Sequence, residues 1–129
     1  MNTKYYYGLG RRKRSSVRAK YYDSETLEVT ANGRDAKEYF TAYYYETLQT
    51  MFTNIGLKTG KITLFSNGGG LTGQSEAARL AIAKALLKKD ETIKPTLKLF
   101  NYLTTDNRKV LPKRSGLKKA RKARQWVKR

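Results

Sequence analysis

The stretch KITLFSNGGGLTGQSEAARLAIAKALLKK, residues 61–89, decides which kind of fold this chain can adopt. Its first four residues alternate polar and apolar side chains, and residues 61–65 predict a strand. The glycines at 68–70 interrupt that pattern. Residues 72–89 are rich in Ala, Leu and Lys and predict a long helix, with Thr72 or Ser75 as its cap. One face of this helix carries Ala78, Ile82, Ala85 and Leu86.

The same alternation predicts further strands upstream. Residues 16–21 form one, and the three tyrosines at 5–7 are its expected partner. The segment between them, residues 8–14, is predicted to be a glycine-flexible basic loop. Residues 26–31 alternate again and end at Asn32-Gly33, a strong turn signal. The inward side of the 16–21 strand is expected to hold Val17, Ala19 and Tyr21.

Two shorter helical regions complete the pattern. Asp35 followed by Glu38 indicates a capping box that opens a short helix, and residues 44–52 carry an apolar stripe at helical spacing. Downstream, residues 92–102 predict a short helix with Pro95 in its first turn, where proline is tolerated. The sequence therefore predicts an α+β domain with a mixed sheet of about four strands and helices on one face.

The charge is concentrated at the two ends of the chain, which has a net charge of +18. Residues 1–22 hold seven basic and no acidic side chains, and residues 107–129 hold eleven basic and no acidic ones. The stretch between them is neutral, with ten of each sign. We therefore predict a globular domain over residues 1–106 and an extended basic tail over 107–129. The basic segment of each is expected to bind a polyanion.

Several functional classes are excluded by composition. The 129 residues contain no Cys and no His, which removes thiol nucleophiles, zinc fingers and the commonest general base and metal ligand. We find no catalytic pair among the acids, so we expect no enzyme activity, no metal, no cofactor and no small-molecule substrate. The sequence also lacks a membrane-spanning run and a signal-peptide pattern, which favours a soluble intracellular protein without a membrane partner.

Two segments of the predicted domain are candidates for RNA contact. Four adjacent cations, with one more on the following strand, favour phosphate binding; they are Arg11, Arg12, Lys13, Arg14 and Arg18. The glycines Gly68, Gly69 and Gly70 join a strand to a helix N-terminus, where free backbone N–H groups can meet a phosphate. No Gly-Lys-Ser/Thr follows them, so a mononucleotide site is weakly supported. A tight strand–helix turn explains the glycines about equally well.

The tail is the third candidate, because its cations repel one another in water and each phosphate they neutralise releases counterions. Its predicted RNA-binding residues are Lys113, Arg114, Lys118, Lys119, Arg121, Lys122 and Arg124. If eight tail cations meet phosphates, the log–log salt slope of binding is about −6 to −7. Trp126 lies between cations and is expected to stack on a base or ribose. The alternative to RNA binding is a tail that only makes the protein soluble, and the alternative for Trp126 is that it folds back onto the domain.

These motifs resemble those of the bacterial-type small-subunit ribosomal protein nine family. The resemblance lies in Gly8-Leu9-Gly10-Arg11-Arg12-Lys13, in residues 29–35, in residues 67–74 running into the long helix, in residues 116–121, and in the terminal Lys128-Arg129. The blocks occur in order and cover essentially the whole chain. The tip departs from the family pattern, because Trp126 and Val127 replace a smaller aromatic residue and a serine.

The resemblance implies a left-handed β-α-β crossover and a place in the head of the small ribosomal subunit, in the cytoplasm. It implies partners of three kinds, namely small-subunit rRNA, peptidyl-site tRNA and other head proteins. Lys128 and Arg129 match the family's terminal cations, so they are expected to contact that tRNA.

Three other functions are less consistent with the sequence. A phosphoryl-transfer enzyme is disfavoured because no His, Cys or acidic metal cluster is present. A membrane-surface protein is disfavoured because the few apolar residues of the tail are mostly Ala. A DNA-compacting protein is the nearest rival, and equal affinity for duplex DNA and rRNA would favour it.

Overall fold

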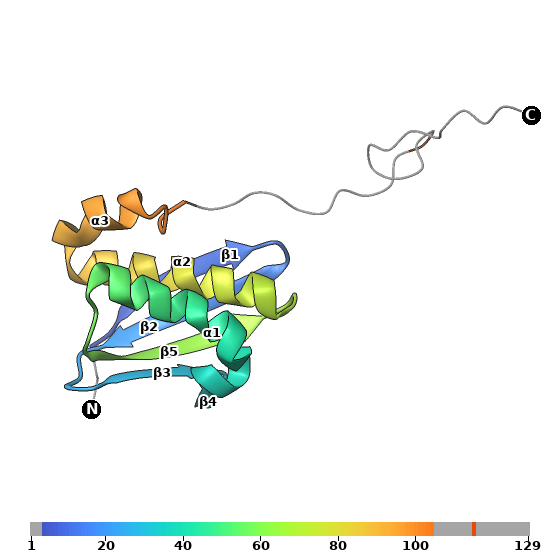
Figure 1. The fold of residues 1–129 in the computed structure, drawn as a ribbon, viewed down its shortest axis with the longest axis horizontal. Coiled ribbons are helices and arrows are strands. Elements are labelled where there is room, and N and C mark those ends of the chain that lie inside the picture. The colour runs from blue at the N-terminus through green and yellow to red at the C-terminus, as the bar shows by residue number, and fades with distance from the viewer. Residues whose placement is uncertain (1–3, 105–114, 116–129) are drawn as a thin grey trace, which may run out of the picture.

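The computed structural model describes residues 4–104 and residue 115. Its five strands form one mixed sheet in the order β1-β2-β5-β3-β4 (Figure 1). Their bounds are β1 Tyr6–Arg12, β2 Ser15–Tyr22, β3 Leu27–Ala31, β4 Arg34–Asp35 and β5 Gly60–Asn67. The α+β class and the mixed sheet are confirmed. The strand beyond the four expected ones is β4, whose two residues are too few to show any alternation.

The helices α1 (Ala36–Ile55) and α2 (Leu71–Lys89) cover one face of this sheet (Figure 1). The 3-10 helix η1 (Glu91–Ile93) and the short helix α3 (Lys94–Leu99) follow, with Pro95 in the first turn as predicted. Strands β3 and β5 are parallel neighbours joined through α1. In Figure 1 both strands run to the right, α1 lies in front of the sheet, and β5 lies above β3. The β3-α1-β5 connection is therefore a left-handed crossover.

The core lies between α2 and the inward side of the central strands. Val17, Ala19 and Tyr21 of β2 are buried as predicted, and Ile62 and Leu64 of β5 pack beside them. The predicted helix face of α2, comprising Ala78, Ile82, Ala85 and Leu86, is buried as well. Small side chains dominate α2, so the helix can approach the sheet closely.

The expected basic loop over residues 8–14 is wrong. Residues 8–12 belong to β1, and the turn contains only Lys13 and Arg14. A Cβ on Gly8 would overlap the carbonyl oxygen of Ala81, and one on Gly10 would overlap that of Ala77. The glycines therefore let α2 pack directly on β1 rather than making the chain flexible.

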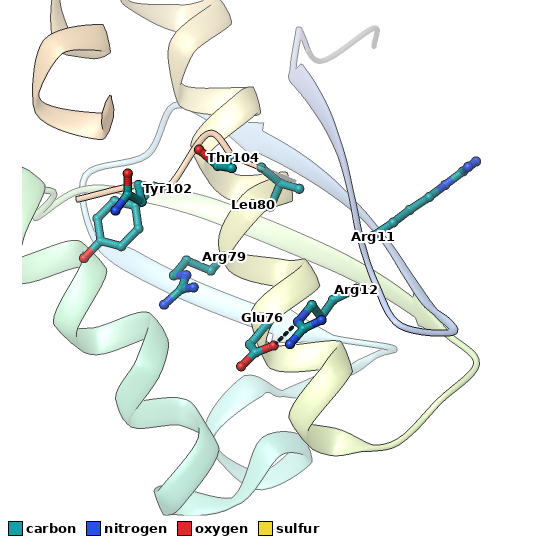
Figure 2. A pocket seen from close by; sticks show the side chains of 8 residues that line it. Arg11, Arg12, Glu76, Arg79, Leu80, Tyr102 and Thr104 are labelled. Carbon is teal, nitrogen blue, oxygen red and sulfur yellow. Dashed lines mark hydrogen bonds and ion pairs between the residues drawn. The ribbon is translucent and has the colours of Figure 1, made fainter. Parts of the chain in front are cut away.

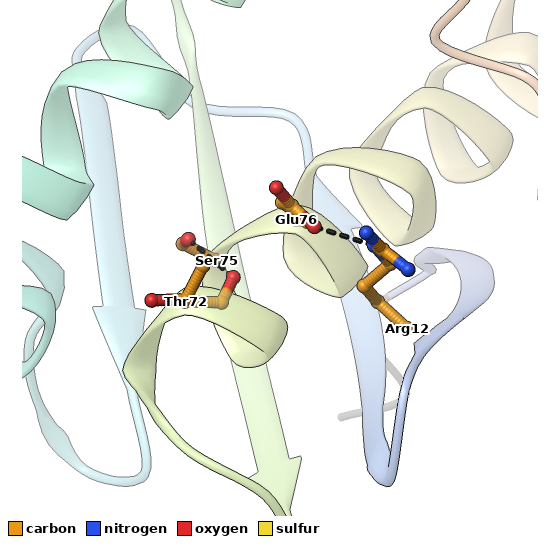
Figure 3. A network of polar contacts seen from close by, with 4 residues as sticks. All are labelled: Arg12, Thr72, Ser75 and Glu76. Carbon is orange, nitrogen blue, oxygen red and sulfur yellow. Dashed lines mark hydrogen bonds and ion pairs between the residues drawn. The ribbon is translucent and has the colours of Figure 1, made fainter. Parts of the chain in front are cut away.

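The N-termini of α1 and α2 differ from the predicted ones in detail. Asp35 caps α1 as predicted, but its carboxylate accepts from the Lys37 amide at 3.1 Å. The two helical stretches predicted here form one element with a break at Thr41, where φ is 65° and ψ is 163°. The cap of α2 is Gly70, without a side-chain hydrogen bond. Ser75 instead donates to the Thr72 carbonyl at 2.9 Å, one turn into the helix (Figure 3).

Candidate nucleic-acid interface

The tip of the β1–β2 hairpin presents exposed cations. The last paired residues are Arg12 and Ser15, so Lys13 and Arg14 alone make the turn. Lys13 has φ of 55°, which is the left-handed conformation that tight hairpins use. The side chains of Arg11, Lys13 and Arg14 are exposed. A rigid hairpin thus holds three of the predicted cations in solvent.

The glycine loop after β5 packs against this tip. Gly68 and Gly69 have φ of 76° and 66°, so glycine is favoured at both positions. A Cβ on Gly69 would overlap the Ser15 hydroxyl, and one on Gly68 would lie 2.7 Å from the Arg14 carbonyl oxygen. Ser15 Oγ donates to the Gly68 carbonyl at 3.0 Å and joins the two loops. The two candidate segments, predicted separately, therefore form a single surface, which we call the tip surface.

The N-terminus of α2 opens onto the tip surface. The helix begins after Gly70, and its first turn contains no acidic residue. Backbone N–H groups and the helix dipole at such an end attract a phosphate. The residues that line one open pocket here are Lys13, Arg14, Ser15, Gly69, Gly70, Thr72 and Gly73. Backbone donors and cations thus face the same space.

A hydrogen-bonded chain behind the glycine loop holds it in place. Gln74 Nε2 donates to the Gly68 carbonyl at 3.0 Å. Gln74 Oε1 accepts from the Tyr39 hydroxyl at 2.8 Å, and that hydroxyl accepts from Asn32 Nδ2 at 3.1 Å. Asn32 also bonds the Ser66 backbone in both directions. These positioning residues come from four separate elements. The sequence indicates the turn at Asn32 and the block 67–74 that ends at Gln74, but not the hydrogen bonds that join them.

Arg12 stands apart from its three basic neighbours. It lies on the helix side of β1, and its Nε is 2.6 Å from the Glu76 carboxylate on α2. The Arg12 side chain is 13% exposed. Figures 2 and 3 show it turned toward Glu76, whereas Figure 2 shows Arg11 extended away from the domain. Arg12 therefore ties β1 to α2, which makes it a weaker candidate for a phosphate contact than Arg11.

Lys89 at the far end of α2 is likewise held within the domain. Its ammonium donates to the Tyr21 hydroxyl at 3.0 Å and lies 2.9 Å from the Asp23 carboxylate. The Tyr21 hydrogen bond, and then that of Asp23, raise the pKa of Lys89, so it is charged at neutral pH. This cation serves the packing of α2 rather than the tip surface.

The remaining predicted site residues are placed as follows. Arg18 is exposed on the uncovered side of the sheet, apart from the tip surface, with its Cζ 5.7 Å from the centre of the Phe65 ring. The continuous described stretch ends at Thr104, which lines the same pocket as Arg11 and Arg79 (Figure 2). All predicted tail residues, from Lys113 to Arg129, lie outside the described residues.

Within the described part of the chain no group of acidic residues can hold a metal ion, and no helix can cross a membrane.

Comparison with known proteins gives a consistent match over nearly the whole chain. The family model described as "Ribosomal protein S9/S16" matches residues 10–129. A protein of Thermotoga neapolitana named "Small ribosomal subunit protein uS9" is 42% identical over 138 aligned positions, covering 96% of each chain. A protein of Thermotoga sp. strain RQ2 with the same name is 40% identical, also covering 96% of each chain.

Proposed function

The chain belongs to the ribosomal protein S9/S16 family, and from this we propose that it is a structural, non-catalytic component of the cytoplasmic small ribosomal subunit that binds small-subunit rRNA. The observation that carries the RNA-binding part is the tip surface. There the hairpin cations, the left-handed glycines and the start of α2 face one space. Arg and Lys side chains and backbone N–H groups are common hydrogen-bond donors to the phosphate oxygens of a nucleic acid.

The proposed mechanism divides the chain at about residue 106. The domain docks rigidly on rRNA through Arg11, Lys13 and Arg14, and Gly68–Gly70 allow the phosphate backbone close to the protein backbone. The basic tail, residues 107–129, neutralises further phosphates by counterion release. Binding of this kind needs no reaction chemistry, which agrees with the absence of Cys and His.

Sedimentation tests this function directly. A cell lysate is separated on a sucrose gradient after a high-salt wash, and the chain is located by antibody. The wash is kept at a salt concentration that intact subunits tolerate, and we expect the chain in the small-subunit fractions, because the phosphate contacts of the domain and of the tail act together on the same RNA. A chain that runs free, or that follows DNA or membranes, contradicts the proposal.

The tail tip is proposed to contact peptidyl-site tRNA. Deleting Lys128 and Arg129 should leave assembly intact and weaken tRNA binding to that site by about 10-fold, since two exposed charge contacts are lost. Filter binding of tRNA to subunits carrying the variant measures the effect. The matched control is Arg108→Gln with Lys109→Gln, which removes the same charge away from the tip and outside the predicted RNA-binding residues. Equal tRNA affinity for the deletion and the wild type rules out the contact.

A further inference from the structure

The side of the sheet away from the helices carries aromatic rings and cations together. The outward residues include Tyr7 and Arg11 on β1, and Arg18, Lys20 and Tyr22 on β2. Strand β5 adds Lys61 and Phe65. Strands β1, β2 and β5 contain no acidic residue at all. We call this set, together with Tyr5, the outer sheet face.

Two rings of this face are open to solvent and bordered by cations. Phe65 is 39% exposed and Tyr5 is 44% exposed. Lys20 Nζ lies 4.8 Å from the centre of the Tyr5 ring and 5.6 Å from that of Phe65. The Tyr5 and Tyr22 ring centres are 5.6 Å apart. Cations held beside exposed rings place positive charge where the phosphates of a stacked nucleotide would lie.

Strand pairing fixes the arrangement of these side chains. Arg18 lies opposite Leu9 on one neighbouring strand and Phe65 on the other, and Lys20 lies opposite Tyr7 and Thr63. Side chains paired across neighbouring strands stand on the same face. The rings and cations are therefore presented on a rigid sheet at strand spacing and need little ordering when a ligand binds.

Resting on the function proposed above, we propose that the outer sheet face binds unpaired nucleotides of RNA. Bases stack on the rings of Phe65 and Tyr5, and the ammonium of Lys20 and the guanidinium of Arg18 move from the rings to the phosphates. A duplex cannot stack on these rings, because its base faces are stacked inside the helix. The partner is polyanionic because β1, β2 and β5 carry cations and no acid, and the one acid of the neighbouring strand β3, Glu28, lies opposite Lys61.

The test compares the full-length chain with Phe65→Leu, which keeps apolar bulk and removes the aromatic face. The probe is a short single-stranded RNA containing a fluorescent adenine analogue whose emission falls on stacking, and a duplex RNA with the same number of phosphates is measured beside it. We expect Phe65→Leu to weaken single-strand binding by about 10-fold, to reduce the quenching, and to leave duplex affinity unchanged. The tail is the same in both chains, so its contribution cancels.

The matched control is Tyr43→Leu, because Tyr43 is a 76% exposed aromatic residue on α1, away from the outer sheet face. It should change neither affinity nor quenching. If Phe65→Leu does not fold, Lys20→Gln replaces it and should make the single-strand salt slope shallower by about one unit.

Unchanged single-strand affinity and quenching in Phe65→Leu overturn the proposal. So does a variant that binds both RNAs normally but is washed from small subunits at lower salt, because the face would then contact a protein. Neither result affects the proposed function, which fails only if the wild-type chain does not sediment with small subunits.

Discussion

Gly10→Ala is expected to destabilise the folded domain by about 3 kcal/mol. The added Cβ would overlap the carbonyl oxygen of Ala77 and lie 2.7 Å from the amide nitrogen of Ala81, both on the backbone of α2. A backbone cannot move aside as a flexible side chain can, so β1 and α2 must separate. Chemical denaturation followed by circular dichroism measures the loss, and Gly8→Ala should behave alike.

The control for this prediction is Gly70→Ser. Gly70 has no atom within 4 Å of an added Cβ, its φ is −103°, and it caps α2 without a side-chain hydrogen bond. Serine is a preferred residue at such a position, so stability should stay the same or rise by a few tenths of a kcal/mol. A Gly10→Ala chain as stable as the wild type would show that α2 and β1 do not pack this closely in solution.

Removing residues 107–129 is expected to change RNA affinity more than any substitution in the domain. The truncation deletes eleven of the 28 basic residues and no acidic one. If eight of them meet phosphates, the slope of log affinity against log salt becomes shallower by about 6 to 7. Fluorescence titration of a small-subunit rRNA fragment at several salt concentrations measures that slope. The unfolding midpoint should be unchanged, because the predicted core lies within residues 1–106.

The residual slope of the truncated chain reports on the tip surface. Adding Lys13→Gln and Arg14→Gln should reduce it by about 1.5 more, since both side chains are exposed on that surface. A truncated chain that keeps the full slope would place the phosphate contacts in the domain instead. A truncated chain that fails to fold would contradict a domain boundary at residue 106.

Local patterns predicted the elements whose residues repeat regularly. The strands at 16–21 and 61–65 are predictable because one side of each is buried against the helices, so polar and apolar residues alternate over 16–21 and over 61–64. The long helix was found because small and aliphatic residues recur at helical spacing. For β1 the sequence predicts a strand at 5–7 and a loop at 8–14, whereas the strand is Tyr6–Arg12. The reason is that a strand that contacts a helix through glycine shows no apolar alternation.

The candidate site was predicted in pieces and assembled only by the fold. The basic run and the glycine run are both visible in the sequence, but they are separated by more than fifty residues. They meet because β2 and β5 are antiparallel neighbours, with Ser16 opposite Asn67, which places the start of one strand beside the end of the other. The same pairing brings Phe65 beside Arg18 on the outer sheet face.

The local periods were therefore sufficient for the class of fold and the sequence motifs for the family, because hydrophobic repeats and short motifs are properties of neighbouring residues. Strand partners, the pairing of Arg12 with Glu76 and the contact between hairpin and glycine loop depended on the tertiary structure. The reason is physical: each of these is set by which surfaces the chain must bury together, and that choice involves residues far apart in the sequence.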